Sequence, residues 1–345
     1  MIGAALPQIG IRPSGGIVPR LSLELAQAAE AAGFASVWFA ENPFQRGAIA
    51  TAGACAAATQ RVRIGIGVVN PFSRHPTLIA MEAAALDELC EGRVVLGIGS
   101  GIGSAVRRMG GANDRAITAV REAIAIVRAM LSGDMVTYRA KVFCIEDVKL
   151  GFRPQRRDLP VFMAGAGDRA LRTCGEIADG LIVSNLTPPN STERMAPILA
   201  EAAARAGRTM PRIVQYVPCV ARPDRDAARR AAKSAIGEML IDFWPAGDDW
   251  PPARQALAAE SGIGRHDLGA ALARLRRGDD AASALDERFV EAFAIAGTAA
   301  DCVHQAARYR KAGVDELALS FAGTQPAADI AYFGRAFATA SRSGV

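Results

Sequence analysis

Residues 61–101 constrain the fold more than any other stretch, because they have the pattern of two buried strands joined by a helix. Residues 61–69 and 93–98 are short runs dominated by valine, isoleucine and glycine, without the polar alternation of a half-exposed strand. Between them, residues 76–90 have the composition of a helix, and Pro76 stands in its first turn, where the N–H that proline lacks is not needed. Two such strands joined by a helix predict a parallel pair that is covered on both faces.

The same alternation of strand and helix extends over the whole chain of 345 residues. It predicts an α/β protein with the (β/α)8 fold, the TIM barrel, and a doubly wound open sheet is the alternative. We expect residues 1–345 to form a single barrel domain with two insertions. One is a hairpin or extended segment at about 134–153, and the other is an irregular segment at about 241–285 that could lie over the barrel mouth. The eight predicted strands are residues 2–6, 36–40, 61–69, 93–98, 160–164, 180–184, 212–220 and 316–321.

The composition argues against several classes of protein. No apolar run approaches the ~18 residues of a membrane span. The formal charge is +5, but the basic residues do not cluster with aromatic ones, so we expect neither a membrane nor a nucleic acid as partner. The N-terminus lacks a basic segment before an apolar one and the six cysteines are scattered, which together indicate a cytoplasmic protein. The three histidines lie far apart, so no metal site is expected.

If the fold is a barrel, the functional residues follow the C-terminal ends of the strands, where the βα loops converge. Two glycine-rich turns lie there, GIGSGIG at 97–103 and AGAGDR at 164–169. Backbone N–H groups of such turns attract phosphate, although ordinary tight turns have similar sequences. Few acid–base groups accompany them, which is typical of an enzyme whose cofactor carries the chemistry. From the residues at these strand ends we select the following candidates for the site: Glu41, Asn42, Gly67, Val68, Val69, Asn70, Gly99, Ser100, Gly101, Gly165, Ala166, Gly167, Asp168 and Ser184.

Two ionisable side chains near these ends have more than one interpretation. Glu41 ends an apolar strand, and a carboxylate there either pairs with an arginine of a neighbouring loop or faces a ligand. His75 precedes Pro76 at a helix start, which favours a structural or capping role over that of a catalytic base. The spacing indicates no Ser-His-Asp or Cys-His arrangement.

Three segments carry a resemblance to a known family. They are FASVWFAEN at 34–42, VVNPFSRHPTLIAMEAAALDELCEGRVVLGIGSG at 68–101, and FAIAGTAADCVHQAARYRKAGVDELALSF at 293–321. Together they resemble the bacterial-luciferase-like flavin and deazaflavin oxidoreductases, and most closely the branch that includes methylenetetrahydromethanopterin reductase. The resemblance covers most of the chain apart from about 241–285.

The resemblance implies a TIM barrel, usually dimeric, that binds coenzyme F420 or FMN at the C-terminal ends of its strands. It implies a bulge with a non-prolyl cis peptide behind the cofactor ring, which falls at residues 67–69 here. It also implies phosphate contacts from the turns at residues 100–101 and 165–167, the same turns that backbone chemistry selects. We therefore expect the selected residues from Gly67 to Ser184 to bind the cofactor.

The chain departs from the family pattern at two places. Many deazaflavin members carry Asp-His where this chain has Glu41-Asn42, which become the candidate catalytic residues. Sugar-phosphate dehydrogenases of the family carry an acidic residue soon after the fourth-strand glycines, where Ile102 and Gly103 stand here, so that activity is not expected. Glu41 is the candidate for orienting the ring or relaying a proton, with a hydrogen bond from Asn42 or Asn70.

Three functions stay open at this point. The first is an oxidoreductase that transfers a hydride between F420 and a small organic substrate with an unsaturated or imine-like carbon. The second is an FMN-dependent monooxygenase that uses oxygen and reduced flavin supplied by a partner reductase. The third is a cofactor-binding barrel without turnover. In each case we expect a homodimer.

Overall fold

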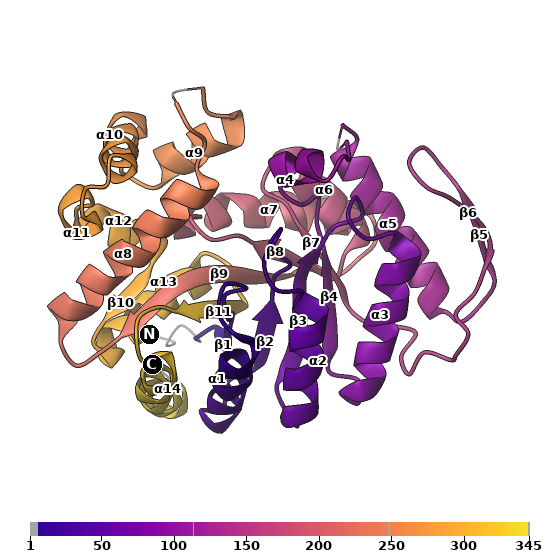
Figure 1. Cartoon of the computed structure of the whole chain (residues 1–345), viewed down its shortest axis with the longest axis horizontal. Coiled ribbons are helices and arrows are strands. Elements are labelled where there is room, and N and C mark those ends of the chain that lie inside the picture. Colours follow the sequence, from indigo (N-terminus) through magenta and orange to yellow (C-terminus); the bar gives the residue numbers. More distant parts are fainter. Residues whose placement is uncertain (1–5, 113, 248, 344–345) are drawn as a thin grey trace.

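Eight parallel strands close into a barrel surrounded by helices (Figure 1), so the predicted TIM barrel is confirmed. The order around the ring is β11-β1-β2-β3-β4-β7-β8-β9, and the pairing of β9 with both β8 and β11 closes it. The computed structural model describes residues 6–112, 114–247 and 249–343. The barrel strands are β1 (Gln8–Ile11), β2 (Ser36–Phe39), β3 (Arg63–Val69), β4 (Val94–Ile98), β7 (Val161–Ala164), β8 (Gly180–Val183), β9 (Arg212–Ala221) and β11 (Glu316–Phe321).

The strands are apolar because they are buried on both faces. In β2, Val37 and Phe39 pack against the outer helices, whereas Trp38 between them packs inside the barrel. No helix within the described ranges is long and apolar enough to cross a membrane. The helices are α1 (Pro19–Ala31), α2 (Ala48–Ala58), α3 (Pro76–Leu89), α4 (Gly103–Arg108), α5 (Ala116–Leu131), α6 (Asp168–Ile177), α7 (Pro189–Arg205), α8 (Arg225–Phe243), α9 (Pro252–Glu260), α10 (Arg265–Arg276), α11 (Ala281–Ala284), α12 (Glu287–Phe293), α13 (Ala299–Lys311) and α14 (Pro326–Ser343).

The first strand lies later in the chain than the sequence predicts. The predicted strand at 2–6 falls almost wholly outside the described residues, and β1 instead pairs Gln8 with Glu316 of β11. The sequence pattern places Gly10 in a loop, but Gly10 lies within β1 beside Ser36. A Cβ at Gly10 would lie 2.0 Å from the Ser36 Oγ, so the close approach of β1 and β2 requires glycine there. The short helix α4 and the strand β10 (Ile295–Gly297), which extends the sheet beside β9, are also unpredicted.

The two segments that we expect to be insertions lie at opposite ends of the molecule in Figure 1. The first contains the predicted hairpin, in which β5 (Val136–Arg139) pairs antiparallel with β6 (Cys144–Val148). The second is helical rather than irregular: its helices α10 and α11 pack against α8, and α9 packs against α10 and α7. Trp244 and Trp250 meet in this second core with their ring centroids 5.4 Å apart. Sequence reasoning missed these helices because glycine and proline interrupt their apolar pattern.

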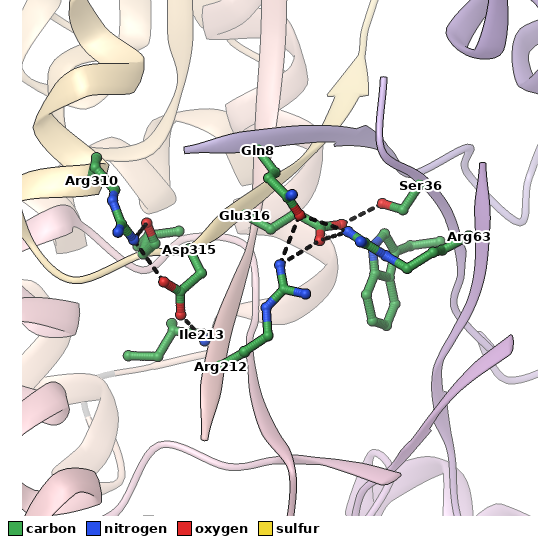
Figure 2. A network of polar contacts seen from close by, with 10 residues as sticks. Gln8, Ser36, Arg63, Arg212, Ile213, Arg310, Asp315 and Glu316 are labelled. Carbon is green, nitrogen blue, oxygen red and sulfur yellow. Dashed lines mark hydrogen bonds and ion pairs between the residues drawn. The ribbon is translucent and has the colours of Figure 1, made fainter. Parts of the chain in front are cut away.

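A polar network crosses the N-terminal end of the barrel around the buried carboxylate of Glu316 (Figure 2). Trp38 Nε1 donates to its Oε1 at 2.9 Å, and the Ser36 hydroxyl donates to the same oxygen. Arg63 Nη2 binds Oε2 at 2.5 Å, and Arg212 approaches the same oxygen at 3.6 Å. The carboxylate therefore ties β11 to β2, β3 and β9, at the end of the barrel away from the converging βα loops.

One helix cap leads to a pH-dependent prediction. Hydrogen bonds from Arg225 and from Thr298 hold the pKa of Asp301 down to about 2. A carboxyl whose pKa is lower in the folded than in the unfolded protein stabilises the fold above its unfolded pKa, and this contribution is lost as the pH falls through the folded pKa. We expect Asp301→Asn to lower the free energy of unfolding by about 1 kcal/mol at pH 7 and by progressively less between pH 4 and pH 2. Urea unfolding of both proteins across this range measures the difference, and a difference independent of pH would contradict the assignment.

Candidate active site

A cavity of about 290 Å³ opens where the barrel strands end. The ends of β2, β3, β4, β7 and β8 contribute most of its lining, and residues of α8 and α9 reach it from the second core. We call it the first cavity. Ten of the residues that the sequence selects line it: Glu41, Asn42, Gly67, Val68, Asn70, Gly99, Ser100, Gly101, Gly165 and Ser184.

The bulge of β3 forms one wall of the first cavity. The peptide bond between Gly67 and Val68 is cis, as predicted, and the register with β4 shifts at this point. Tyr216 of β9 reaches across the barrel, and its hydroxyl donates to the carbonyl oxygen of Gly67 at 2.9 Å. Burial raises the pKa of the Tyr216 phenol, so the hydroxyl keeps its proton and acts as the donor.

Gly67 is required because Tyr216 lies so close to it. A Cβ at Gly67 would lie 1.9 Å from the Tyr216 hydroxyl oxygen and 2.9 Å from Cε3 of Trp38. We expect Gly67→Ala to lower the free energy of unfolding by about 2–3 kcal/mol, since the core must shift to accept the methyl group. Tyr216→Phe removes the first atom that the methyl group meets, so the double variant should lose at least about 1 kcal/mol less than the sum of the two single losses. Urea unfolding of all three variants measures this coupling, and strictly additive losses would contradict the proposed clash.

Glu41 is held in place by an arginine of the next βα loop. Arg74 contacts the Glu41 Oε1 through both Nε and Nη2 at 2.7 Å, and its Nη1 binds the carboxylate of Glu82 at 2.8 Å. The other oxygen, Oε2, is buried and has no hydrogen-bond partner among the described residues. The interpretation that Glu41 pairs with an arginine is confirmed. Glu41 also lines the first cavity, and its contact with a ligand there stays a prediction.

The glycine turn after β4 packs against the loop after β3. Gly101 has a φ of +67°, and a Cβ there would lie 2.9 Å from Cγ of Asn70. The Asn70 Oδ1 accepts hydrogen bonds from the backbone N–H groups of Phe72 and Ser73 at 3.1 and 3.0 Å. Asn70 therefore orders its own loop beside the turn that we expect to bind phosphate.

Four of the selected residues do not line the first cavity. Val69 is buried and packs in the outer core, because side chains alternate along a strand and its neighbour Val68 takes the inner face. Ala166 and Gly167 lie further along the turn, where Gly167 precedes α6. Asp168 is exposed, and its carboxylate lies 3.5 Å from Arg194. A role for these four in cofactor binding stays a prediction.

The chain is similar to known proteins along most of its length. The profile of the luciferase-like monooxygenase family matches residues 2–316. The chain belongs to this luciferase-like family. It is 29% identical over 293 residues to 5,10-methylenetetrahydromethanopterin reductase of Methanolobus tindarius, covering 85% of each chain. It is 31% identical over 265 residues to F420-dependent glucose-6-phosphate dehydrogenase of Microbacterium testaceum, covering 72% of this chain and 73% of that protein.

Solved structures of the luciferase-like family agree with this placement. The coenzyme F420-dependent tetrahydromethanopterin reductase of Methanopyrus kandleri superposes with a TM-score of 0.87 at 25% identity, covering 97% of this chain and 99% of the reductase. A monooxygenase from Streptomyces bottropensis shares the fold, with a TM-score of 0.73 at 21% identity and coverage of 96% and 99%. The predicted relationship to flavin and deazaflavin oxidoreductases is therefore confirmed.

The first cavity is also lined by residues that the sequence analysis did not select. Arg12 follows β1, and the strand-end rule would have selected it had β1 been placed correctly. Tyr216 lies within the apolar run of β9 and has the sequence context of an ordinary core residue. Phe243 and Arg254 come from the 241–285 segment that the sequence analysis places near the barrel mouth, but no sequence signal marks these two residues individually.

His75 has the structural role that its position predicts. It is the N-cap of α3, and its Nδ1 accepts a hydrogen bond from the backbone N–H of Thr77 at 3.3 Å. Its ring packs edge-on against Phe143 with the centroids 5.6 Å apart, and burial lowers the pKa of the imidazole. His75 is not among the residues that line the first cavity.

Proposed function

We propose that this protein is an F420-dependent oxidoreductase that transfers a hydride between the deazaflavin ring and a small organic substrate. The observation that carries the proposal is the shared location of the bulge at Gly67–Val68, the glycine turns at Gly101 and Gly165, and Glu41 around one cavity. Relatives named as F420-dependent align with most of the chain, which supports F420 as the cofactor. When bound, F420 would supply the hydride chemistry, and the protein would bind and orient it.

The lining of the first cavity suits a flat ring that carries a phosphate-bearing chain. Glycine keeps its walls close, since a Cβ at Gly99 would lie 2.8 Å from Cγ2 of Val68. Backbone N–H groups of Ser100, Gly101 and Gly165 are the groups that we propose to bind the phosphate. The bulge at Val68 would support one face of the ring.

Glu41 is the side chain that we propose to act in catalysis. Its buried Oε2 has no partner among the described residues, and we propose that this oxygen accepts a hydrogen bond or a proton from a ligand of the cavity that Glu41 lines. The ion pair with Arg74 holds the carboxylate in place through Oε1. Because Arg74 does not contact Oε2, that oxygen keeps its capacity to accept a hydrogen bond. Asn42 and Asn70 line the same cavity and are the proposed neutral donors near the ring.

Fluorescence titration of the purified protein with F420 and with FMN tests the cofactor. We expect F420 to bind at least about tenfold more tightly than FMN. A preference for FMN, with oxygen consumed when reduced FMN is supplied, would replace the proposal with the monooxygenase. If the protein bound neither compound, both the F420-dependent oxidoreductase and the FMN-dependent monooxygenase would be ruled out.

The assembly and location of the protein are further parts of the proposal. We propose a homodimer, supported by Leu78, Met81 and Leu89, three apolar side chains of α3 that remain largely exposed in the monomer. Light scattering during size-exclusion chromatography measures the mass. A cytoplasmic location is supported by the cysteines, since all six are free.

A further inference from the structure

A second cavity of about 420 Å³ adjoins the first. It lies over the ends of β1 and β11 and is bounded by α8 and the start of α1, on the side of the barrel away from the bulge of β3. The two cavities meet at four residues that line both of them: Arg12, Asn42, Asn185 and Phe243. A molecule in the second cavity would therefore lie next to whatever occupies the first.

Arg12 stands at this junction as a buried positive charge that forms no ion pair with a described residue. The residue is only 8% exposed, and its Nε is buried without a hydrogen-bond partner. Its one side-chain hydrogen bond to a described residue is long, from Nη1 to the Ser320 hydroxyl at 3.4 Å. Among the described residues no carboxylate forms an ion pair with it, and burial lowers the pKa of its guanidinium. Arginine nevertheless stays charged in proteins, so the missing partner is an anion.

The orientation of Arg12 is fixed by Tyr216. The guanidinium carbon lies over the Tyr216 ring, 5.1 Å from its centroid, and the Tyr216 hydroxyl is in turn bound to the carbonyl of Gly67. Two other arginines do pair with a buried carboxylate: Arg63 binds Glu316 and Arg156 binds Asp87. Arg12 differs from these because its planar fork is held at a cavity wall with donors left over.

We propose that Arg12 binds the carboxylate of the substrate, whose apolar body lies in the second cavity. The apolar part of the lining comes from Ile17, Leu21, Leu25, Leu319 and Ile330. That this ligand is the substrate rests on the proposed function, whereas the binding itself does not.

The charges of the second cavity select a monoanion over a dianion. Arg12 is its only cationic lining residue among those the structure describes, and Glu238 and Asp242 of α8 also line it. A single carboxylate matches the one guanidinium, which it can bind through two parallel hydrogen bonds. A phosphate dianion would leave one charge unbalanced beside two carboxylates.

Calorimetric titration of the full chain without cofactor tests this assignment. The probes are the straight-chain carboxylates from butanoate to decanoate and 3-phenylpropanoate, each paired with its neutral amide, and phenyl phosphate. We expect at least one carboxylate to bind at least about tenfold more tightly than its amide and more tightly than phenyl phosphate. Equal binding of each acid and its amide, or tighter binding of phenyl phosphate, would overturn the proposal. This comparison needs no variant, so it holds even if substitution of Arg12 unfolds the protein.

Variants then locate the anion. We expect Arg12→Gln to weaken the preferred carboxylate at least about tenfold and Arg12→Lys, which keeps the charge without the fork, to weaken it less. Arg254→Gln is the matched control, because Arg254 also lacks a carboxylate partner among the described residues but lines only the first cavity. It should leave the carboxylate affinity within about twofold. An equal loss in the control, or no loss in Arg12→Gln, would overturn the assignment.

Titration of the same variants with F420 separates this proposal from the proposed function. Because Arg12 also lines the first cavity, we expect Arg12→Gln to weaken F420 binding by a smaller factor than it weakens the preferred carboxylate. If Arg12→Gln lost F420 instead of the carboxylate, Arg12 would belong to the cofactor site and the inference would fail. If the wild type bound neither F420 nor FMN but kept its preference for a carboxylate at Arg12, the proposed function would fail while this binding site stood.

Discussion

Replacing Glu41 by glutamine is expected to lower turnover by about 100-fold, while F420 binds with unchanged affinity. A positioned acid–base group typically contributes at least this factor, and glutamine keeps the shape and one acceptor oxygen but cannot take up a proton. Glu41 is suited to this role because it lines the first cavity and because Arg74 holds only its Oε1, leaving Oε2 buried and without a partner among the described residues. Deazaflavin absorbance under single-turnover conditions measures the rate, and a separate titration measures the affinity.

Glu82 provides the matched control for Glu41. Glu82 lies on α3 and binds Arg74, as Glu41 does, but Glu82 does not line the first cavity. We expect Glu82→Gln to change turnover by less than about threefold, since exposed or half-exposed ion pairs contribute little. If both variants lost turnover equally, the effect would come from the position of Arg74 rather than from proton transfer. Unchanged turnover in Glu41→Gln would remove Glu41 from the mechanism.

The fold was predictable because its strands carry a strong signal. A barrel strand is covered on both faces, so β3 and β4 are short apolar runs that stand out from the helices around them. The exception is β1, where Gly10 was needed for its contact with Ser36 and so looked like a loop residue. In this strand a tertiary contact, rather than local propensity, decided the residue.

The site was predictable where its residues follow the ends of strands that the sequence places correctly. The glycine turns and the bulge follow from where strands end, and Gly67, Gly101 and Gly165 line the cavity as expected. Tyr216 and Arg12 could not be found in the same way, because their roles depend on contacts across the barrel. A tyrosine within an apolar strand has the same local sequence whether it fills the core or holds a carbonyl of the cavity wall.

Replacing Glu316 by leucine is expected to lower the free energy of unfolding by about 3–5 kcal/mol, the typical cost of breaking a buried charge pair. The carboxylate is nearly inaccessible, and it accepts hydrogen bonds from Trp38, Ser36 and Arg63 (Figure 2). Leucine leaves the buried donors of Trp38 and Ser36 without their acceptor. Urea unfolding of both proteins measures the loss, provided that the dependence of the unfolding free energy on urea concentration is the same in both.

Two further variants identify its cause. Glu316→Gln keeps an acceptor for Trp38, so it should cost only about 1–2 kcal/mol. The exposed pair of Arg139 and Glu146 on the β5–β6 hairpin, 63% and 64% exposed, is the control, and Glu146→Gln should cost less than about 0.5 kcal/mol.

The double variant Glu316→Leu/Arg63→Met distinguishes a lost charge pair from a lost shape. Replacing both members of a buried pair by apolar groups is often neutral, because no charge is then left unpaired. We expect the double variant to recover at least about 1 kcal/mol relative to Glu316→Leu. No recovery would mean that the cost lies in the orphaned Trp38 and Ser36 donors, since these lose their acceptor in both variants. Because the network lies at the opposite end of the strands from the first cavity, F420 affinity should stay unchanged in Glu316→Gln.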